Sequence, residues 1–339
     1  MSRKTGIAAA LAAAVLVFGA SFAAARSTSG TLKGAGSTFV FPLISQWQAN
    51  YKGAQITYGS VGSGAGIAAI TARTVDFGAS DAPLSKDQAT ACKGCEQIPW
   101  ALSATSIPYH VPGVSYGLKL TGKILAGIYL GHITRWDDAA IKRINPGVSL
   151  PSLKITPVYR SDSSGTSFNF SDYLSQVSPE WRSKIGVGTQ PAFPTGLGGR
   201  GSGGLAGILS RTDGAIGYVD VAYSLRNGFK VASVQNRAGR FQLPGLRGIA
   251  AAAKTIKKVP SNGALSIVNP PRSQKLAYPI CTFTYVIVPV RGAPKAPALK
   301  QFINWAITSG QSFGPPLRFF PLPKVVQAAD KKFVAKIHR

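Results

Sequence analysis

The pattern of hydrophobic and polar positions predicts short strands that alternate with helices along most of the chain. Runs of aromatic and β-branched residues bounded by glycine are typical of buried strands, and apolar residues spaced three and four apart are typical of helices. Strands are predicted at 55–58, 74–78, 155–159, 215–219 and 283–290, and helices at 67–73, 248–258 and 300–308. This alternation predicts an α/β fold.

The size and composition of the chain fit a globular protein with a substantial core. With 339 residues the chain exceeds one ordinary domain, so two domains or one large domain are expected. Apolar residues make up 45% of the chain and charged residues 15%. The segment 236–274 is rich in Gly, Ala, Lys and Pro, and loops are expected on both sides of its helix.

The first 25 residues have the pattern of a secretory signal peptide. Arg3 and Lys4 give a positive start, residues 7–18 are apolar, and the alanines at 23–25 suit a cleavage site. No cysteine lies near that site, so a lipid anchor is not expected. After residue 25 the chain contains no apolar run of the ~18 residues that a membrane helix needs. The mature protein is therefore predicted to be soluble, exported and periplasmic.

The net charge of the chain is strongly positive. There are 38 Lys and Arg residues against 12 acids, a formal charge of +26, and removal of Arg3 and Lys4 leaves +24 on residues 26–339. This excess indicates either a polyanionic partner, such as nucleic acid or an anionic membrane, or acidic surroundings in which carboxylates lose their charge. The basic residues are scattered and form no nucleic-acid-binding motif, so no specific nucleic-acid partner is expected.

Two of the three cysteines lie close together, in the stretch Cys92-Lys93-Gly94-Cys95. In an oxidising compartment this spacing favours a structural disulfide. Redox chemistry and half of a zinc site share the spacing, but zinc needs two further ligands and the three histidines are isolated. Cys281 lies in an apolar strand-like run and is predicted to be a buried free thiol.

Four segments combine glycine, hydroxyl groups and a turn that precedes a helix. They are 34–39 (GAGSTF), 62–66 (GSGAG), 160–167 (RSDSSGTS) and 196–204 (GLGGRGSGG). A helix N-terminus offers unpaired N–H donors and a partial positive charge, which suit a tetrahedral oxyanion. Arg160 adds a planar donor for two oxygens of one anion. Taken singly, each segment is also explained by an N-cap or by turn geometry.

A carboxylate accompanies these donors. Asp81 follows a predicted strand in the stretch 74–84 (TVDFGASDAPL). It is interpreted either as a cap or turn residue or as an acceptor for a proton that the ligand carries. Nucleotide-binding glycine motifs of the Walker and G-x-G-x-x-G kinds, in their required strand and helix context, are absent from the sequence.

In this order the segments resemble the periplasmic phosphate-binding proteins of ABC transporters, the PstS-like family. The resemblance runs from about 34 to 223, through GAGSTF, GSVGSGAG, TVDFGASDAPL, YRSDSSGTSFNF, GLGGRGSGG and GAIGYVD, with a weaker part near 302–310. It implies a type II periplasmic-binding-protein fold, in which two α/β lobes are joined by crossing strands around a ligand cleft. Lobe one would comprise 26–110 plus 280–339, and lobe two would comprise 111–279.

The resemblance also implies a role for individual residues, with inorganic phosphate as the ligand. The hydroxyl and amide of Thr38, the amide of Phe39, Ser63, and the helix N-terminus Ser164, Gly165 and Thr166 would donate hydrogen bonds. Arg160 would supply a charge-assisted pair with Asp162 orienting it, and Asp81 would accept a hydrogen bond from a protonated phosphate oxygen. Sulfate has no proton to donate, so its repulsion by Asp81 would give selectivity for phosphate.

The leading hypothesis is a monomeric binding protein that delivers phosphate to ABC-transporter permease subunits in the inner membrane. No catalytic residue, metal or cofactor is expected. A phosphoester hydrolase with Asp81 or Ser164 as nucleophile would need a metal or a neighbouring base that the sequence does not indicate. Two further hypotheses stay open: a receptor for molybdate, sulfate or a phosphonate, and a surface that binds polyanions.

Overall fold

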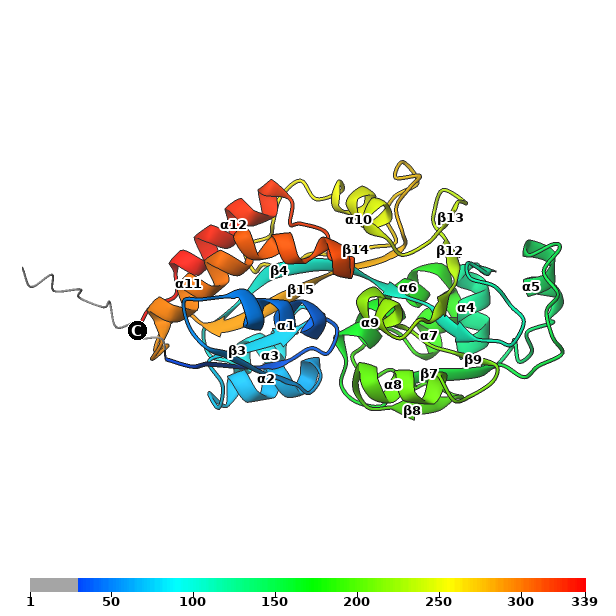
Figure 1. Ribbon diagram of the computed structural model, residues 1–339, viewed down its shortest axis with the longest axis horizontal. Helices are drawn as coiled ribbons and strands as arrows, with labels where there is room; N and C mark the ends of the chain where they lie inside the picture. Colours follow the sequence, from blue (N-terminus) through cyan, green and yellow to red (C-terminus); the bar gives the residue numbers. More distant parts are fainter. Residues whose placement is uncertain (1–29) are drawn as a thin grey trace, which may run out of the picture.

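The computed structural model describes residues 30–339, and it confirms the predicted α/β architecture (Figure 1). Helices and strands alternate along the chain and build two bodies, each around its own sheet. The predicted signal peptide at 1–25 lies outside the described residues. Within 30–339, every helix is too short or too polar to cross a membrane.

The larger sheet has the strand order β10-β4-β15-β3-β1-β2, with β14 paired to β15. Its strands are β1 (Leu32–Gly36), β2 (Ile56–Ser60), β3 (Phe77–Ser80), β4 (Cys95–Ser106), β10 (Val219–Asp220), β14 (Ile267–Val268) and β15 (Ile280–Pro289). Strand β1 pairs in parallel with both β2 and β3. Because parallel strands end at the same edge of a sheet, the residues that follow these three strands lie close together.

Five helices accompany this sheet, and an aromatic cluster fills its core. The helices are α1 (Phe41–Asn50), α2 (Ser63–Thr71), α3 (Lys86–Ala91), α11 (Ala296–Ala306) and α12 (Lys324–Ala335), with short 3₁₀ turns at Ser309–Phe313 and Pro315–Leu317. The rings of Trp47 and Trp100 meet edge to face at 5.0 Å, and Phe302 packs on both. Trp47 is fully buried and its indole N–H donates to the carbonyl of Gly310 at 2.8 Å.

The second body is built on a five-stranded sheet, order β11-β5-β9-β7-β8, beside a three-stranded sheet, order β13-β12-β6. The strands are β5 (Pro108–His110), β6 (Lys119–Leu120), β7 (Thr156–Arg160), β8 (Leu197–Gly199), β9 (Ala215–Ile216), β11 (Lys230–Val231), β12 (Ser233–Gln235) and β13 (Phe241–Gln242). The helices are α4 (Gly122–Tyr129), α5 (Ala139–Ile144), α6 (Gly165–Val177), α7 (Pro179–Lys184), α8 (Gly201–Leu209) and α9 (Val221–Arg226). Strand β7 pairs in parallel with β8, so their ends also share one edge.

The prediction of a single strand at 215–219 is wrong, because the chain passes there from one sheet to the other. Strand β9 pairs with β5 and β7, whereas β10 pairs with β4 of the larger sheet. Between them, Tyr218 turns its hydroxyl inward to accept from the backbone N–H of Arg160 at 3.0 Å. Tyr218 lies between the two short strands and is fully buried.

The poorly patterned segment after 236 packs against the larger sheet. Helix α10 (Leu246–Ala253) contacts β4 and β14; it overlaps the predicted helix 248–258 but ends five residues earlier. Farther along, Gln97 on β4 donates to the carbonyl of Asn262 at 2.8 Å, and the N–H of Leu265 donates to the Tyr285 hydroxyl at 3.1 Å. Residues 246–268 therefore lie against the first body although they follow the second in sequence.

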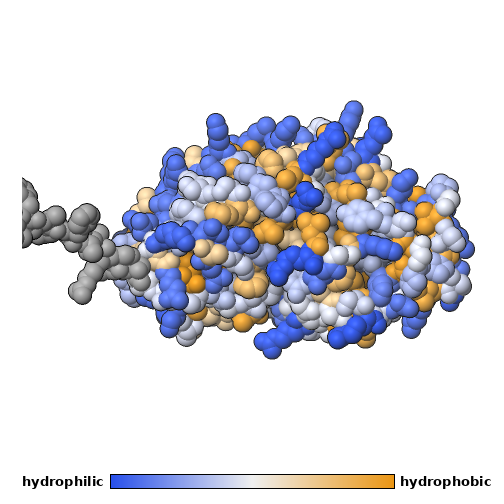
Figure 2. Space-filling model, viewed as in Figure 1, coloured by the Kyte–Doolittle hydropathy of each residue, from blue (hydrophilic) through white to orange (hydrophobic). Residues whose placement is uncertain are grey.

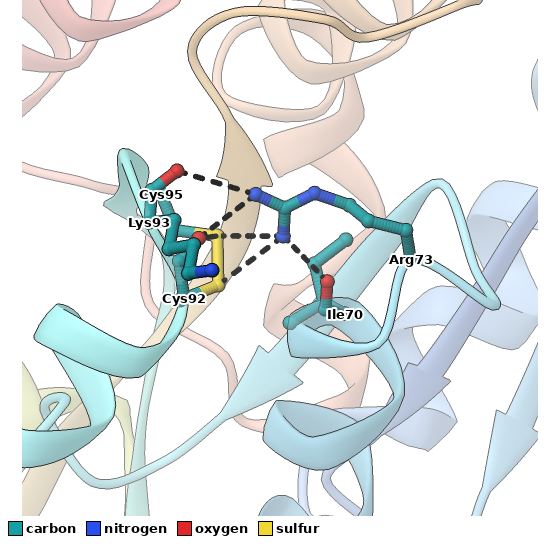
Figure 3. Close-up of a disulfide and its surroundings, with 5 residues drawn as sticks. All are labelled: Ile70, Arg73, Cys92, Lys93 and Cys95. Carbon is teal, nitrogen blue, oxygen red and sulfur yellow. Dashed lines mark hydrogen bonds between the residues drawn. A yellow bond between two sulfur atoms is a disulfide. The ribbon is translucent and has the colours of Figure 1, made fainter.

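Cys92 and Cys95 form a disulfide, and Arg73 hydrogen-bonds to the loop that the disulfide closes (Figure 3). The Arg73 guanidinium donates to the carbonyls of Ile70 at 2.7 Å and of Cys92 at 2.8 Å. It thereby ties the end of α2 to the disulfide loop. The prediction that Cys281 is a buried free thiol is confirmed.

Candidate anion-binding site

Each of the four predicted glycine and hydroxyl segments opens a helix at the end of a strand. In the first body, Thr38 follows β1 and Ser63 follows β2, directly before or at the start of α1 and α2. In the second, residues 161–164 join β7 to α6, and Arg200 alone separates β8 from α8. The βα connections of both sheets thus bring their helix N-termini together, and hydrogen bonds between the two bodies link them directly.

Asp81 lies at the centre of these segments, directly after β3. The Ser37 hydroxyl donates to Oδ1 of Asp81, and the Ser63 hydroxyl donates to Oδ2 at 3.4 Å. The carboxylate is 2% exposed, so its hydrogen-bond partners replace water. The Ser37 hydroxyl also accepts from the backbone N–H of Phe39 at 3.0 Å, which places the predicted amide donor beside the same carboxylate.

Two hydroxyls of the first body contact helix N-termini of the second. The Ser63 Oγ accepts from the backbone N–H of Gly165 at 3.1 Å. The Thr38 Oγ1 lies 2.9 Å from Ser202 Oγ and accepts from the Ser202 N–H at 3.2 Å. These contacts join α2 to α6 and the end of β1 to α8, so the predicted donors Thr38, Ser63 and Gly165 are brought together.

Glycine is required where α6 approaches Asp81. A Cβ on Gly165 would lie 2.7 Å from the backbone nitrogens of Asp81 and Ala82, closer than atoms can pack. A Cβ on Gly62, which has φ +99°, would lie 2.4 Å from Oδ2 of Asp162. Both glycines permit close contact between the two bodies at the site.

Arg160 and Asp162 form a buried bidentate pair beside these helices. The guanidinium Nε donates to Oδ1 of Asp162 at 2.7 Å and a terminal nitrogen donates to Oδ2 at 2.5 Å. Asp162 Oδ1 also accepts from the N–H of Gly201 at 2.9 Å, at the start of α8. Arg160 is 4% exposed, so the carboxylate fixes the direction of a buried cation.

The electrostatics of the two carboxylates differ. Burial raises the pKa of Asp81 to about 6, although hydrogen bonds from Ser37 and Ser63 and the charge of Arg160 oppose the rise. For Asp162, burial is outweighed by the hydrogen bonds and charge of Arg160, which hold its pKa below the usual range. Asp162 therefore stays ionised and paired with Arg160, whereas the pKa of Asp81 lies close to neutral pH.

The N-terminus of α6 supplies further donors. Ser164 is the N-cap, and its Oγ accepts from the N–H of Ser167 at 3.2 Å. The Thr166 hydroxyl is buried without a hydrogen-bond partner in the described residues, which is costly for a polar atom unless a ligand contacts it. The site therefore offers hydroxyl, amide and guanidinium donors around a carboxylate acceptor, as a partly protonated oxyanion requires.

Several residues that shape the site received no role from the sequence. Ser37 and Ser202 lie inside the glycine and hydroxyl segments, and that membership is the signal that could have found them. Asp220 accepts from Ser202 at 3.4 Å, and burial raises its pKa to about 8. Asn169 on α6 donates to the carbonyl of Asp81 at 2.8 Å and accepts from Thr282 at 3.0 Å.

Residues 30–339 bring no three His, Cys, Asp or Glu side chains together as a metal site.

Sequence comparisons agree with this geometry. A family model described as the PBP superfamily domain matches residues 22–309. A phosphate-binding protein PstS of Xylella fastidiosa (strain Temecula1) is 41% identical over 307 residues, which cover 88% of this chain and 84% of the relative. A phosphate-binding protein PstS of Pasteurella multocida is 36% identical and covers 87% of each chain.

Solved structures share the arrangement of the elements. A high-affinity periplasmic phosphate-binding protein, PfluDING, solved with bound phosphate, has a TM-score of 0.73 at 21% identity and covers 89% of this chain and 93% of its own. A phosphate-binding protein from Stenotrophomonas maltophilia has a TM-score of 0.72, again at 21% identity, with the same coverage.

Proposed function

The chain belongs to the PBP superfamily and, within it, to the PstS phosphate-binding proteins, and we propose that it captures inorganic phosphate between its two α/β lobes. The predicted periplasmic-binding-protein fold is confirmed by the likeness to solved members. Members of this family bind solutes and are not enzymes. The observation that carries the proposal is the buried Asp81 surrounded by helix N-termini and Arg160.

Donors from both lobes act on the phosphate oxygens. Thr38 and Ser63 contribute from lobe one, and Arg160 and Thr166 from lobe two. The Ser164 hydroxyl and the backbone amides of Gly165 and Phe39 add donors, and Asp162 holds the guanidinium in place. Capture exchanges the bond between Ser63 and the Gly165 N–H, and the bond between Thr38 and Ser202, for bonds to the ligand.

Asp81 accepts the proton that phosphate carries as a hydrogen bond. Above its pKa of about 6 the carboxylate has only acceptors, so a P–OH group satisfies it and a fully deprotonated sulfate does not. The burial of Asp81 makes an unmatched anion costly. Selectivity for phosphate over sulfate follows from this contact.

The lobe boundaries that fit the contacts differ from the sequence prediction of 26–110 plus 280–339 for lobe one and 111–279 for lobe two. Strand β5 (Pro108–His110) pairs with β9 and β11, so we assign it to lobe two. Residues 246–268 pack on β4 and β15 through α10 and Leu265. We assign this segment to lobe one, so that it moves with the larger sheet when the lobes separate. The antiparallel pair of β4 and β15 forms the centre of the lobe-one sheet. Ile107 connects β4 to β5 of lobe two.

The proposed delivery of phosphate to a transporter requires a protein outside the cytoplasm. We infer export to the periplasm through the signal peptide at 1–25, and action as a monomer that delivers phosphate to permease subunits of an ABC transporter. Cys92 and Cys95, joined as a disulfide, suit an oxidising compartment.

Calorimetric titration of residues 26–339 tests the proposal. The protein is unfolded, freed of ligand, refolded, and titrated with phosphate and separately with sulfate. One-to-one phosphate binding with little response to sulfate is expected. A folded sample that binds no phosphate, or that binds sulfate equally well, contradicts the assignment of ligand and selector.

A further inference from the structure

The positive charge of the protein is concentrated in the last third of the chain. Residues 221–339 contain 19 Lys and Arg residues and one acid, Asp330, a net charge of +18. Residues 30–220 contain 16 Lys and Arg residues and 11 acids, a net charge of +5. A general adaptation of the surface to acidic surroundings would spread the excess over both parts. The asymmetry indicates a partner for one side of the molecule.

The charges of this part are largely uncompensated. Among the described ion pairs, only Lys295 and Lys336 of residues 221–339 contact a carboxylate, those of Asp76 and Glu96. The single acid of the segment, Asp330, is fully buried, so it neutralises nothing at the surface. Exposed lysines here therefore face solvent without local acidic partners.

Part of this charge lies on or directly after two helices that pack against the same strand. Helices α10 and α12 both contact β4 and lie along the upper edge of the molecule in Figure 1. Lys254, Lys257 and Lys258, which follow α10 in the chain, are exposed, as are Lys331 and Lys332 on α12. Figure 2 shows hydrophilic side chains projecting along this edge. These five lysines define the basic face.

Exposed apolar residues accompany the charge. Leu243 and Leu276 are 41% and 42% exposed, and they follow β13 and Lys275 directly in sequence. Leu276, Lys275 and Arg240 line one open hollow of about 560 Å³. Apolar side chains beside cations suit the headgroup region of a lipid bilayer, whereas a soluble polyanion has no apolar phase to receive them.

We propose that the basic face, together with Leu243 and Leu276, docks the protein on an anionic lipid surface. Each lysine near such a surface contributes to binding through the negative surface potential, and the attraction weakens as salt screens it. The phosphate cleft takes no part in this contact. Docking would hold the receptor at a membrane while leaving its cleft free.

Vesicle sedimentation tests this proposal with the full mature chain, residues 26–339. The probes are vesicles of phosphatidylcholine alone and vesicles of equal parts phosphatidylglycerol and phosphatidylcholine, at low and high salt. We expect binding only to the anionic vesicles, weakened by salt. A variant with Lys254, Lys257, Lys258, Lys331 and Lys332 changed to Gln is expected to bind at least about 100-fold more weakly, since each lysine contributes roughly fivefold.

A matched variant separates a docking face from total charge. It changes five exposed lysines outside the face to Gln: Lys33, Lys52, Lys86, Lys93 and Lys154. Its binding is expected to fall far less, and both variants are expected to retain the unfolding temperature and phosphate affinity of the parent. Equal losses in the two variants, equal binding to both vesicle types, or a Leu243→Ser, Leu276→Ser variant that binds vesicles like the parent would overturn the proposal.

Discussion

The hydroxyl of Ser63 and the backbone N–H of Gly165 meet at 3.1 Å, although 102 residues separate them in the chain. Ser63 is the first residue of α2 and Gly165 is the first residue of α6. Two helix N-termini, each with a partial positive charge, therefore face one another across the lobes. An anion bound between them would stabilise an approach that the helix dipoles alone oppose, as the proposed capture of phosphate between the lobes requires.

Substitution of Gly165 by Ala is expected to weaken phosphate binding by roughly tenfold or more. The added Cβ would lie 2.7 Å from the backbone nitrogens of Asp81 and Ala82, so α6 must move away from its partner lobe. The free energy of unfolding is expected to change little, because Ala is favourable in a helix. Titration calorimetry and urea unfolding measure the two effects.

Gly207→Ala on α8 is the matched control for this substitution. A Cβ there meets only the flexible Arg211 guanidinium, at 3.4 Å. Unchanged phosphate affinity is expected in this control. If Gly165→Ala bound phosphate as tightly as the parent, the close approach of α6 to Asp81 would not belong to the bound state.

Substitution of Asp81 by Asn is expected to lower the preference for phosphate over sulfate by roughly 10- to 100-fold at pH above 7. The amide offers a donor to sulfate in place of a repulsive charge. Competition titrations with the two anions give the ratio. Asp213→Asn serves as the control because its side chain is 65% exposed in a different part of the chain.

The same contact predicts a pH dependence in the parent protein. Because the pKa of Asp81 is about 6, protonation below that value lets the carboxyl donate to sulfate, and the preference for phosphate should decrease. The Asp81→Asn variant should show no such decrease. If the parent's preference for phosphate over sulfate stayed constant as the pH fell below about 6, Asp81 would not be the residue that rejects sulfate.

The free energy of unfolding is expected to be greater in mild acid than in mild alkali, and Asp330 is a main cause. Burial raises its pKa to about 9, and both carboxyl oxygens lack partners within the described residues. Between the unfolded and folded pKa values the folded protein binds more protons than the unfolded chain, so stability falls as pH rises. Asp81 and Asp220, with pKa values raised to about 6 and 8, act in the same direction.

Urea unfolding of the parent and of Asp330→Asn measures this effect. Between about pH 5 and pH 8 the parent is expected to lose roughly 2–4 kcal/mol more than the variant. The comparison cancels the charge repulsion that both proteins share. Parallel pH profiles for the two proteins would show that Asp330 is not neutral in the folded state.

Loss of the disulfide is expected to lower the free energy of unfolding by about 2 kcal/mol, since the loop it closes is short. The double variant Cys92→Ser, Cys95→Ser shows this in urea unfolding. Phosphate affinity is expected to stay unchanged, because the Arg73 guanidinium still ties the loop to α2. A reductant should lower the free energy of unfolding of the parent and leave that of the variant unchanged. If the reductant left the parent's free energy of unfolding unchanged, the disulfide would be absent in solution.

The local parts of the site could be predicted from the sequence. The run of β-branched and aromatic residues at 283–290 lies almost wholly within β15, and the glycine and hydroxyl segments open helices as expected. Hydrophobic periodicity and turn residues depend on a few neighbouring positions, so the sequence alone predicts the strands, helices and turns that they form. The residue pattern supplied Arg160 and Asp81 as candidates and the family resemblance gave each a role toward phosphate. The structure brings both into one buried site.

Only the tertiary structure decided which of these segments touch. The sequence does not reveal that Thr38 contacts Ser202, that Asn169 bonds to the Asp81 carbonyl, or that 215–219 divides between two sheets. Strand pairing and lobe contacts depend on partners that are far away in the chain, and many pairings satisfy the same local pattern. The concentration of charge in 221–339 is likewise visible in the sequence, but the packing of both α10 and α12 on β4 is a property of the tertiary structure.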